Sequence, residues 1–299
     1  MIGPGHLLPT TVVGSYPVVR KGGLRSILDP LSGAVQTAVS DQISAGIDII
    51  SDGQVRSDMI GLFSSDIPGI KGLEVIGPVQ VPSQTHSQND VRYALKKHSW
   101  VKGIVTGPST LAHAFHIANP VYRKKEDLIQ DLAKVVLHEA RSFQDAGVSI
   151  IQIDEPILST GIASLETGRD ALEMIVKTLS TPVAIHVCGD ISGCIDTLVN
   201  LPLDIIDIEC AKSPQNLTVI SKRDLHRKML GYGCIDSSDD EPDSTGTVVK
   251  RIEEALSLVK PESLMLDPDC GMRMLSHETA FKKLSTMVIA AETVRKEIV

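Results

Sequence analysis

The chain has 299 residues, of which 42% are hydrophobic and only 3% aromatic, so it can bury a large core filled mainly by Val, Ile and Leu. Its formal net charge of −8, without any long run of Lys or Arg, argues against nucleic acid as a partner. The N-terminus lacks a signal-peptide pattern and no stretch approaches the ~20 apolar residues of a membrane span, so we expect a cytoplasmic protein without a membrane partner.

Short apolar runs alternate with helical patterns along the whole chain, which is typical of βα units with parallel strands. In chain order, the eight runs are residues 10–13, 47–50, 102–105, 149–153, 183–187, 205–208, 228–231 and 264–266. Eight such units in a chain of this length favour closure into a single (β/α)8 TIM barrel over an open doubly wound sheet. We therefore predict one α/β catalytic domain over residues 1–299.

Two segments between the runs stand out. Residues 125–146 repeat apolar side chains at helical spacing and end before Gly147, which predicts a long helix on the outside of the barrel. Residues 62–100, after the second predicted strand, are rich in Pro, Gly and polar turns. This segment is predicted to be an insertion on the catalytic face, with a hairpin and a loop.

Residues that end barrel strands form the active site in this architecture, and several of them here are metal-ligand types. His186 and Cys188 close one run and point to the same side of an extended segment, Glu209 ends the next run, and Cys270 follows the last. Two thiolates, an imidazole and a carboxylate suit zinc. A His-x-Cys pair alone is more often core packing, and that alternative stays open here.

The number and placement of the cysteines agree with free thiols. Five cysteines are scattered through the chain, and an odd number at such spacing does not indicate a disulfide framework. A zinc ion with thiolate ligands activates water poorly, but it holds an incoming thiol and lowers its pKa. Such a site predicts attack by a substrate thiol on an electrophilic carbon.

Five ordered motifs carry a family resemblance over nearly the whole chain. They are TTVVGSYP, IIQIDEPIL, IHVC, DIIDIECAKS and DPDCGM, and in order and spacing they resemble the catalytic barrel of cobalamin-independent methionine synthase. Because the chain begins close to the first motif, it is similar to the short, stand-alone archaeal-type members. The resemblance implies a methyltransferase that forms methionine from homocysteine.

The resemblance also implies roles for individual residues. The zinc ligands would be His186, Cys188, Glu209 and Cys270, the same set that the strand ends suggest. Asp154 would bind the amino group of homocysteine, which is chemically reasonable because a carboxylate pairs with an ammonium. The backbone of Val13, Gly14 and Ser15 would hold the carboxylate end of homocysteine, with Gly14 allowing close approach.

Three positions depart from the long members of the family. Gln54 replaces a glutamate after the second strand, and it can hydrogen-bond an amino group without neutralising its charge. Ala114 stands where a tryptophan stacks on the pterin, and Asp236 stands where a histidine is thought to protonate the departing folate. These departures favour a donor whose leaving group needs no proton, a methylcorrinoid such as methylcobalamin or a methylated corrinoid protein.

Three alternatives remain at this point. The same reaction could use a methyltetrahydrofolate-type donor, or the acceptor could be another thiol, such as a coenzyme thiol. Outside enzymes, the chain could be a zinc-stabilised barrel that only binds a methyl carrier. Homocysteine is favoured because an acceptor without an amino group would not need the carboxylate of Asp154.

Overall fold

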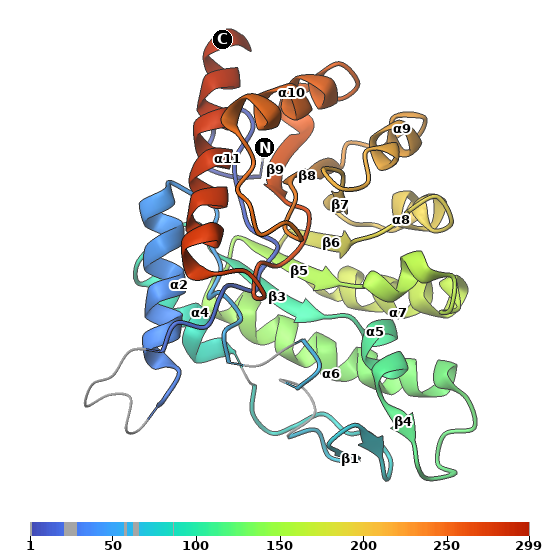
Figure 1. Cartoon of the computed structure of the whole chain (residues 1–299). Helices are drawn as coiled ribbons and strands as arrows, with labels where there is room; N and C mark the ends of the chain where they lie inside the picture. Colours follow the sequence, from blue (N-terminus) through green and yellow to red (C-terminus); the bar gives the residue numbers. More distant parts are fainter. Residues whose placement is uncertain (1, 21–28, 57–58, 62–65, 86, 299) are drawn as a thin grey trace.

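The computed structural model describes residues 2–20, 29–56, 59–61, 66–85 and 87–298, and a parallel sheet lies at its centre (Figure 1). Six strands follow in the order β3-β5-β6-β7-β8-β9. They are β3 (Lys102–Thr106), β5 (Ile150–Asp154), β6 (Val183–Val187), β7 (Ile205–Glu209), β8 (Met229–Ile235) and β9 (Leu264–Pro268). Except for Glu209, every residue of these strands is buried, which accounts for their near-continuous apolar sequences.

Two further segments connect the first and last strands of this sheet. Thr10 bridges to Leu266 of β9, Thr11 bridges to Ile49, and Ile50 bridges to Val101 beside β3, all in parallel. All eight predicted strand positions thus lie in one ring of parallel backbone.

The bounds of several predicted strands need correction. Residues 10–13 and 47–50 contribute isolated bridges at Thr10, Thr11, Ile49 and Ile50 instead of continuous strands. At Thr10, the side chain of Asp48 accepts the backbone N–H, which is then not available to a backbone ladder. Strand β8 begins at Met229, within the predicted run 228–231, and continues beyond it to Ile235.

Helices cover the outside of the sheet (Figure 1). The bounds are α2 (Ser32–Ala45), α5 (Pro108–Ala114), α6 (Lys125–Ala146), α7 (Leu165–Thr178), α8 (Ile195–Asn200), α9 (Gln215–Ser221), α10 (Thr245–Leu256) and α11 (His277–Ile298), with short 3-10 turns η1 (Pro156–Thr160) and η2 (Pro261–Ser263). Helix α6 has the predicted bounds, and Gly147 ends it in the left-handed conformation. Among the described residues, no helix is both long and apolar enough to cross a membrane.

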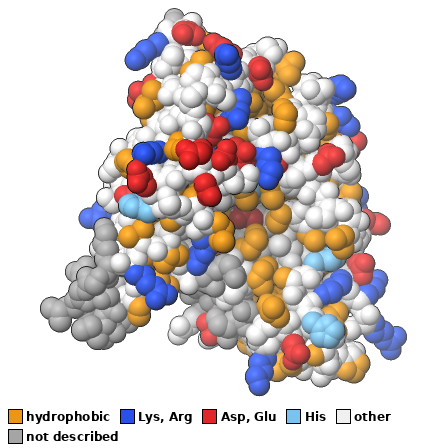
Figure 2. All heavy atoms as spheres, in the orientation of Figure 1, with side chains coloured by type: hydrophobic (Ala, Val, Ile, Leu, Met, Phe, Trp, Pro, Cys, Tyr) orange, Lys and Arg blue, Asp and Glu red, His pale blue; other side chains and the backbone are white. Residues whose placement is uncertain are grey.

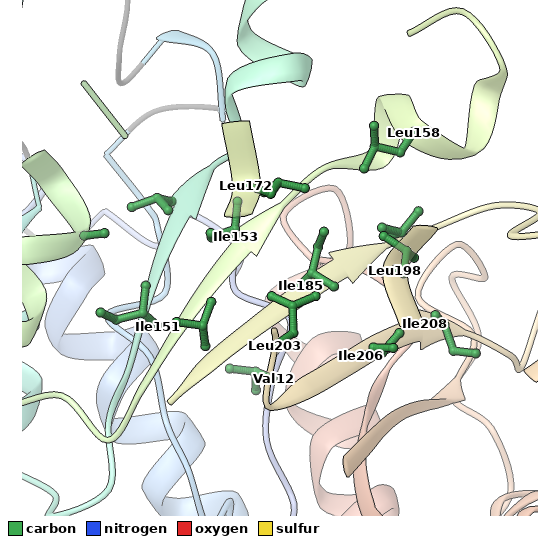
Figure 3. Packing of buried hydrophobic residues seen from close by; sticks show 14 of the residues in the cluster. Val12, Ile151, Ile153, Leu158, Leu172, Ile185, Leu198, Leu203, Ile206 and Ile208 are labelled. Atoms are coloured by element: carbon green, nitrogen blue, oxygen red, sulfur yellow. The ribbon is translucent and has the colours of Figure 1, made fainter. Parts of the chain in front are cut away.

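The strands have different side-chain chemistry on their two faces. Side chains such as Ile151, Ile153 and Ile185 pack between the sheet and its helices (Figure 3). A second, smaller apolar cluster is formed near the beginnings of the strands by Ile49, Ile150, Ala184, Ile205, Met229 and Met265. Because side chains alternate along a strand, the residues that follow on this second face are polar: Gln152, Asp154, His186, Asp207 and Asp267. The interior is therefore apolar at one end and polar at the end where the strands finish.

The segment at residues 62–100 contains the expected hairpin. Strands β1 (Ile70–Lys71) and β2 (Glu74–Val75) pair antiparallel, and β4 (His116–Ile117) adds to β2 in parallel. Helix α4 (Gln88–Leu95) follows the hairpin and packs against α6. Arg56 joins α4 to the rest of the domain, because its guanidinium pairs with both Asp90 of α4 and Asp29 before α2.

Replacing Asp48 by Asn should destabilise the fold by about 2 kcal/mol, the range of a hydrogen bond to a charged group. Asp48 receives hydrogen bonds from the backbone and hydroxyl of Thr10 and from Arg295 of α11, so it ties both ends of the chain to the sheet. Burial would raise the pKa of this carboxyl, but Thr10 and Arg295 hold it below its ordinary value.

The pH dependence of this effect has a defined sign. Since the folded-state pKa is lowered, the stabilisation is present above the unfolded value of about 4 and is lost as the pH falls through the folded value. The free energies of urea unfolding of the original protein and of Asp48→Asn should differ at pH 7, and the difference should shrink as the pH falls below about 4. A difference that does not change with pH would contradict this account.

Candidate active site

Three potential metal ligands from distant parts of the chain meet at the polar end of the interior. His186 lies in β6, Cys188 directly follows β6, and Cys270 follows β9. Their ligand atoms all lie within 4.8 Å of one another. The alternation of side chains along β6 places the imidazole and the first thiol on one side, and the arrangement of the strands brings the second thiol to them.

The environment of His186 fits a metal ligand. The ring is buried, and its Nδ1 lies 3.2 Å from a carboxylate oxygen of Asp207 on the neighbouring strand β7. Among the described residues neither ring nitrogen has a well-formed hydrogen bond. With Nδ1 turned to Asp207, Nε2 is left for a metal, the arrangement in which an outer carboxylate orients a ligating imidazole.

The thiols of Cys188 and Cys270 shift each other's pKa in opposite directions. Hydrogen bonding from Cys188 lowers the pKa of Cys270 to about 4, and His186 adds to this effect against the opposing effect of burial. The hydrogen bond with Cys270, together with burial, raises the pKa of Cys188 above its ordinary value. A lowered pKa favours the thiolate, which is the form of cysteine that binds a metal.

Glu209 lies near these three residues but outside their cluster. It ends β7, where one carboxylate oxygen accepts a hydrogen bond from the Ser213 hydroxyl at 2.5 Å and the other accepts from the backbone of Gly189 at 3.2 Å. Gly189 directly follows Cys188, so the carboxylate is anchored beside the cluster. Its predicted role as fourth ligand stays a prediction.

Asp269 organises the loop after Glu209. Its carboxylate accepts three backbone hydrogen bonds, from Cys210 and Ala211 at 2.8 Å and from Lys212 at 2.7 Å. Because Asp269 directly precedes Cys270, these bonds connect the β7 and β9 ends of the site. The second aspartate of the DPDCGM motif, Asp269, therefore has a structural role.

A cavity of about 280 Å³ opens beside the three ligands. Its lining residues are Val13, Ser15, Gln54, Met59, Thr106, Asp154, Pro156, His186, Cys188, Cys270, Gly271, Arg273 and Met274. The structure thus brings most of the predicted site residues to one cavity, while Gly14 and Glu209 are outside its lining. Figure 2 shows hydrophobic side chains gathered over the ends of β3 and β5, with a group of Asp and Glu side chains over the segment between β8 and α10.

Gly14 and Gln54 are in close contact at the side of the cavity. A Cβ atom on Gly14 would lie 2.5 Å from Oε1 of Gln54, so only glycine allows the carboxamide to lie there. Gln54 has a φ of +43°, a strained conformation for this residue type. Arg273 donates to its carbonyl at 3.0 Å and Asp52 accepts from its N–H at 3.1 Å, which holds the strained backbone in place.

Asp154 ends β5 inside the cavity. Its Oδ1 accepts a hydrogen bond from Gln152 at 2.7 Å. Burial raises the pKa of Asp154 to about 6, although nearby His186 and the hydrogen bond from Gln152 oppose the shift. Among the residues that the structure describes, Asp154 has no ion-pair partner, so this buried carboxylate is suited to bind a positively charged group.

Several contributors to the site were missed by reasoning from the sequence. Arg273 and Met274 directly follow the DPDCGM motif, and Met59 lies near the second strand end. Asp207 and Gln152 each precede a recognised residue by two positions on the same strand. Strand alternation could have identified these last two, whereas nothing local marks Met59.

Comparisons with known proteins agree with this geometry. A family model described as the catalytic domain of cobalamin-independent synthase matches residues 8–293. The methionine synthase of Methanothermobacter marburgensis is 42% identical, covering 94% of this chain and 98% of that protein. The methionine synthase of Methanocaldococcus jannaschii is 36% identical, covering 96% and 99%. The solved structure of a B12-independent methionine synthase from Shewanella in complex with selenomethionine has a TM-score of 0.85 at 26% identity, covering 98% and 99%.

Proposed function

This chain belongs to the cobalamin-independent methionine synthase catalytic-domain family and is a homocysteine methyltransferase, and from this premise we propose a zinc-dependent transfer of methyl from a methylcorrinoid to homocysteine. The observation that carries the proposal is the convergence of His186, Cys188 and Cys270 beside a small cavity. We further propose that the ring of parallel segments is one (β/α)8 barrel over residues 1–299, with residues 62–100 as an insertion. The alternative of a zinc-stabilised barrel that only binds a methyl carrier is not supported, because the matched family and relatives are described as synthases.

His186, Cys188 and Cys270 would hold the zinc, with Glu209 as the fourth and exchangeable ligand. When bound, zinc supplies a site at which a thiol is held as a thiolate nucleophile at neutral pH. Asp207 keeps the His186 ring in the ligating orientation. Ser213 and Gly189 retain the Glu209 carboxylate beside the site by hydrogen bonding.

The other side of the cavity would bind the amino-acid end of homocysteine. Asp154 offers a buried carboxylate to the ammonium group, and Gln54 offers a carboxamide. The backbone of Val13, Gly14 and Ser15 would hold the carboxylate end. A volume near 280 Å³ is at the lower limit of typical ligand cavities, so it suits one small acceptor and leaves the donor to approach from the mouth.

The mouth of the cavity favours a corrinoid over a folate. Among its described lining residues there is no Phe, Tyr or Trp side chain to stack on a pterin, and Phe115, beside Ala114, is buried in the core. Burial would raise the pKa of Asp236, but hydrogen bonds from the Ser238 hydroxyl and backbone hold it below its ordinary value. An ionised carboxylate at position 236 cannot act as the proton donor that the histidine at the corresponding position is thought to be in the long family members.

The experiment that tests the donor is methionine formation by the zinc-loaded protein. Homocysteine is supplied with methylcobalamin in one reaction and with methyltetrahydrofolate in a parallel one, and methionine is measured by mass spectrometry, with zinc-free protein as the control. We expect turnover with methylcobalamin only. Turnover with the folate would reject the corrinoid assignment, and a kcat/KM for a thiol without an amino group that equals or exceeds the kcat/KM for homocysteine would reject the acceptor.

A further inference from the structure

Gln152 makes hydrogen bonds with every polar atom of its side chain inside the sheet. It lies in the middle of β5 and is fully buried. Its Nε2 donates to the carbonyl of Val13 at 2.8 Å and to Oδ1 of Asp154 at 2.7 Å. Its Oε1 accepts from Nζ of Lys102 on β3 at 2.5 Å. One carboxamide thus joins two parts of the proposed amino-acid subsite that are far apart in the sequence.

The chemistry of the neighbours allows only one orientation of this carboxamide. Lys102 has only donors, so Oε1 must face it, and the Val13 carbonyl and the Asp154 carboxylate accept hydrogen bonds, so the amino group must face them. Burial lowers the pKa of Lys102, while Asp207, Asp267 and Asp154 oppose the shift. Either protonation form of Lys102 keeps an N–H for Oε1, so the orientation does not depend on its titration.

Packing alone does not account for this arrangement. Ile150, two residues earlier on the same face, belongs to an apolar cluster, and an apolar side chain at position 152 would avoid burying an amide next to a lysine. Lys102 is 2% exposed, which is rare for this residue type. The hydrogen bonds of this buried pair lead to Asp154 and to Val13.

We propose that Gln152, oriented by Lys102, is the positioning residue of the amino-group subsite. It holds Oδ1 of Asp154, so the other oxygen of this cavity-lining carboxylate is available to the ammonium group of the acceptor. It also fixes the Val13 carbonyl and with it the backbone that leads to Gly14 and Ser15. The inference rests on the proposed role of Asp154 in binding homocysteine.

The first test compares the original protein with Gln152→Met, in which the side chain keeps its length but loses the amide. The KM for homocysteine should rise about tenfold or more, with a smaller change in kcat, because the loss concerns binding of the amino group. The amino-free analogue 4-mercaptobutanoate should be methylated equally by both proteins. Zinc content and the affinity for zinc, measured by chelator competition, should not change. Gln144→Met, which removes a carboxamide at the end of α6, is the matched control.

Two further variants keep the test decisive if Gln152→Met folds poorly. Gln152→Glu preserves shape and the contact with Lys102 but replaces two donors by acceptors beside Asp154, so it should raise the KM for homocysteine at least as much. Lys102→Met should raise this KM in the original background and have little added effect in the Gln152→Met background, as expected for two residues acting through one hydrogen bond.

The outcomes separate this inference from the proposed function. If the original protein forms no methionine, the proposed function fails. If it does and the KM for homocysteine is unchanged in folded Gln152→Met or Gln152→Glu, the positioning role is rejected. Equal losses with homocysteine and with 4-mercaptobutanoate would also reject it, because they would indicate a general disturbance of the interior.

Discussion

Replacing Cys270 by Ser should release zinc and reduce methyl transfer at least about 100-fold, since even outer-shell changes at metal sites weaken metal binding 10–100-fold. Cys270 is one of the three residues whose ligand atoms converge, and the hydrogen bond from Cys188 lowers the pKa of its thiol. The metal-free variant should unfold at nearly the same temperature as the metal-free original, because residues at the strand ends serve function more than stability. Metal analysis, an activity assay and thermal unfolding check these results.

Cys194→Ser is the matched control for this prediction. Cys194 is buried at the start of α8, where its thiol donates to the carbonyl of Ile191, a hydrogen bond that serine can also make. It lies outside the three-ligand cluster, so zinc should be retained. Full zinc content in Cys270→Ser would remove Cys270 from the ligand set.

Replacing Asp154 by Asn should lower kcat/KM for homocysteine about 100-fold. A hydrogen bond to a charged group contributes about 1.5–3 kcal/mol, and each 1.4 kcal/mol is a factor of ten. Gln152 donates to Oδ1, so the carbonyl oxygen of the new amide must face Gln152 and its NH2 group would then face the ammonium of the acceptor. The variant therefore loses an attraction and gains a repulsion.

The control reactions separate the effect of the acceptor's amino group from the effect of its thiol. With 4-mercaptobutanoate, Asp154→Asn should be about as active as the original protein, and zinc content should not change. The exposed Asp170→Asn in α7 should have no effect on either substrate. A loss of the same size with both thiols would contradict the assignment of Asp154 to the amino group.

Much of the fold could be predicted from local patterns. The short apolar runs at 183–187 and 205–208 identified β6 and β7, and the helical repeat ending at Gly147 identified α6, because burial of a strand or of a helix face imposes its own pattern on the sequence. The strand lengths were less predictable. A single side chain, that of Asp48, changes the hydrogen bonding of Thr10, and the hydrophobic periodicity of the sequence does not indicate such a contact.

The sequence by itself determined the residue types at the strand ends, the placement of two candidate metal ligands, His186 and Cys188, on one side of a strand, and membership of the family. Only the tertiary structure decided that Cys270 reaches them, that Asp207 lies against the imidazole, and that Gln152 connects to Val13, 139 residues away. The physical reason is that strand alternation is a local property of the backbone. Contacts across the interior depend instead on the register of six paired strands and on the bridges that join the first strands to the last.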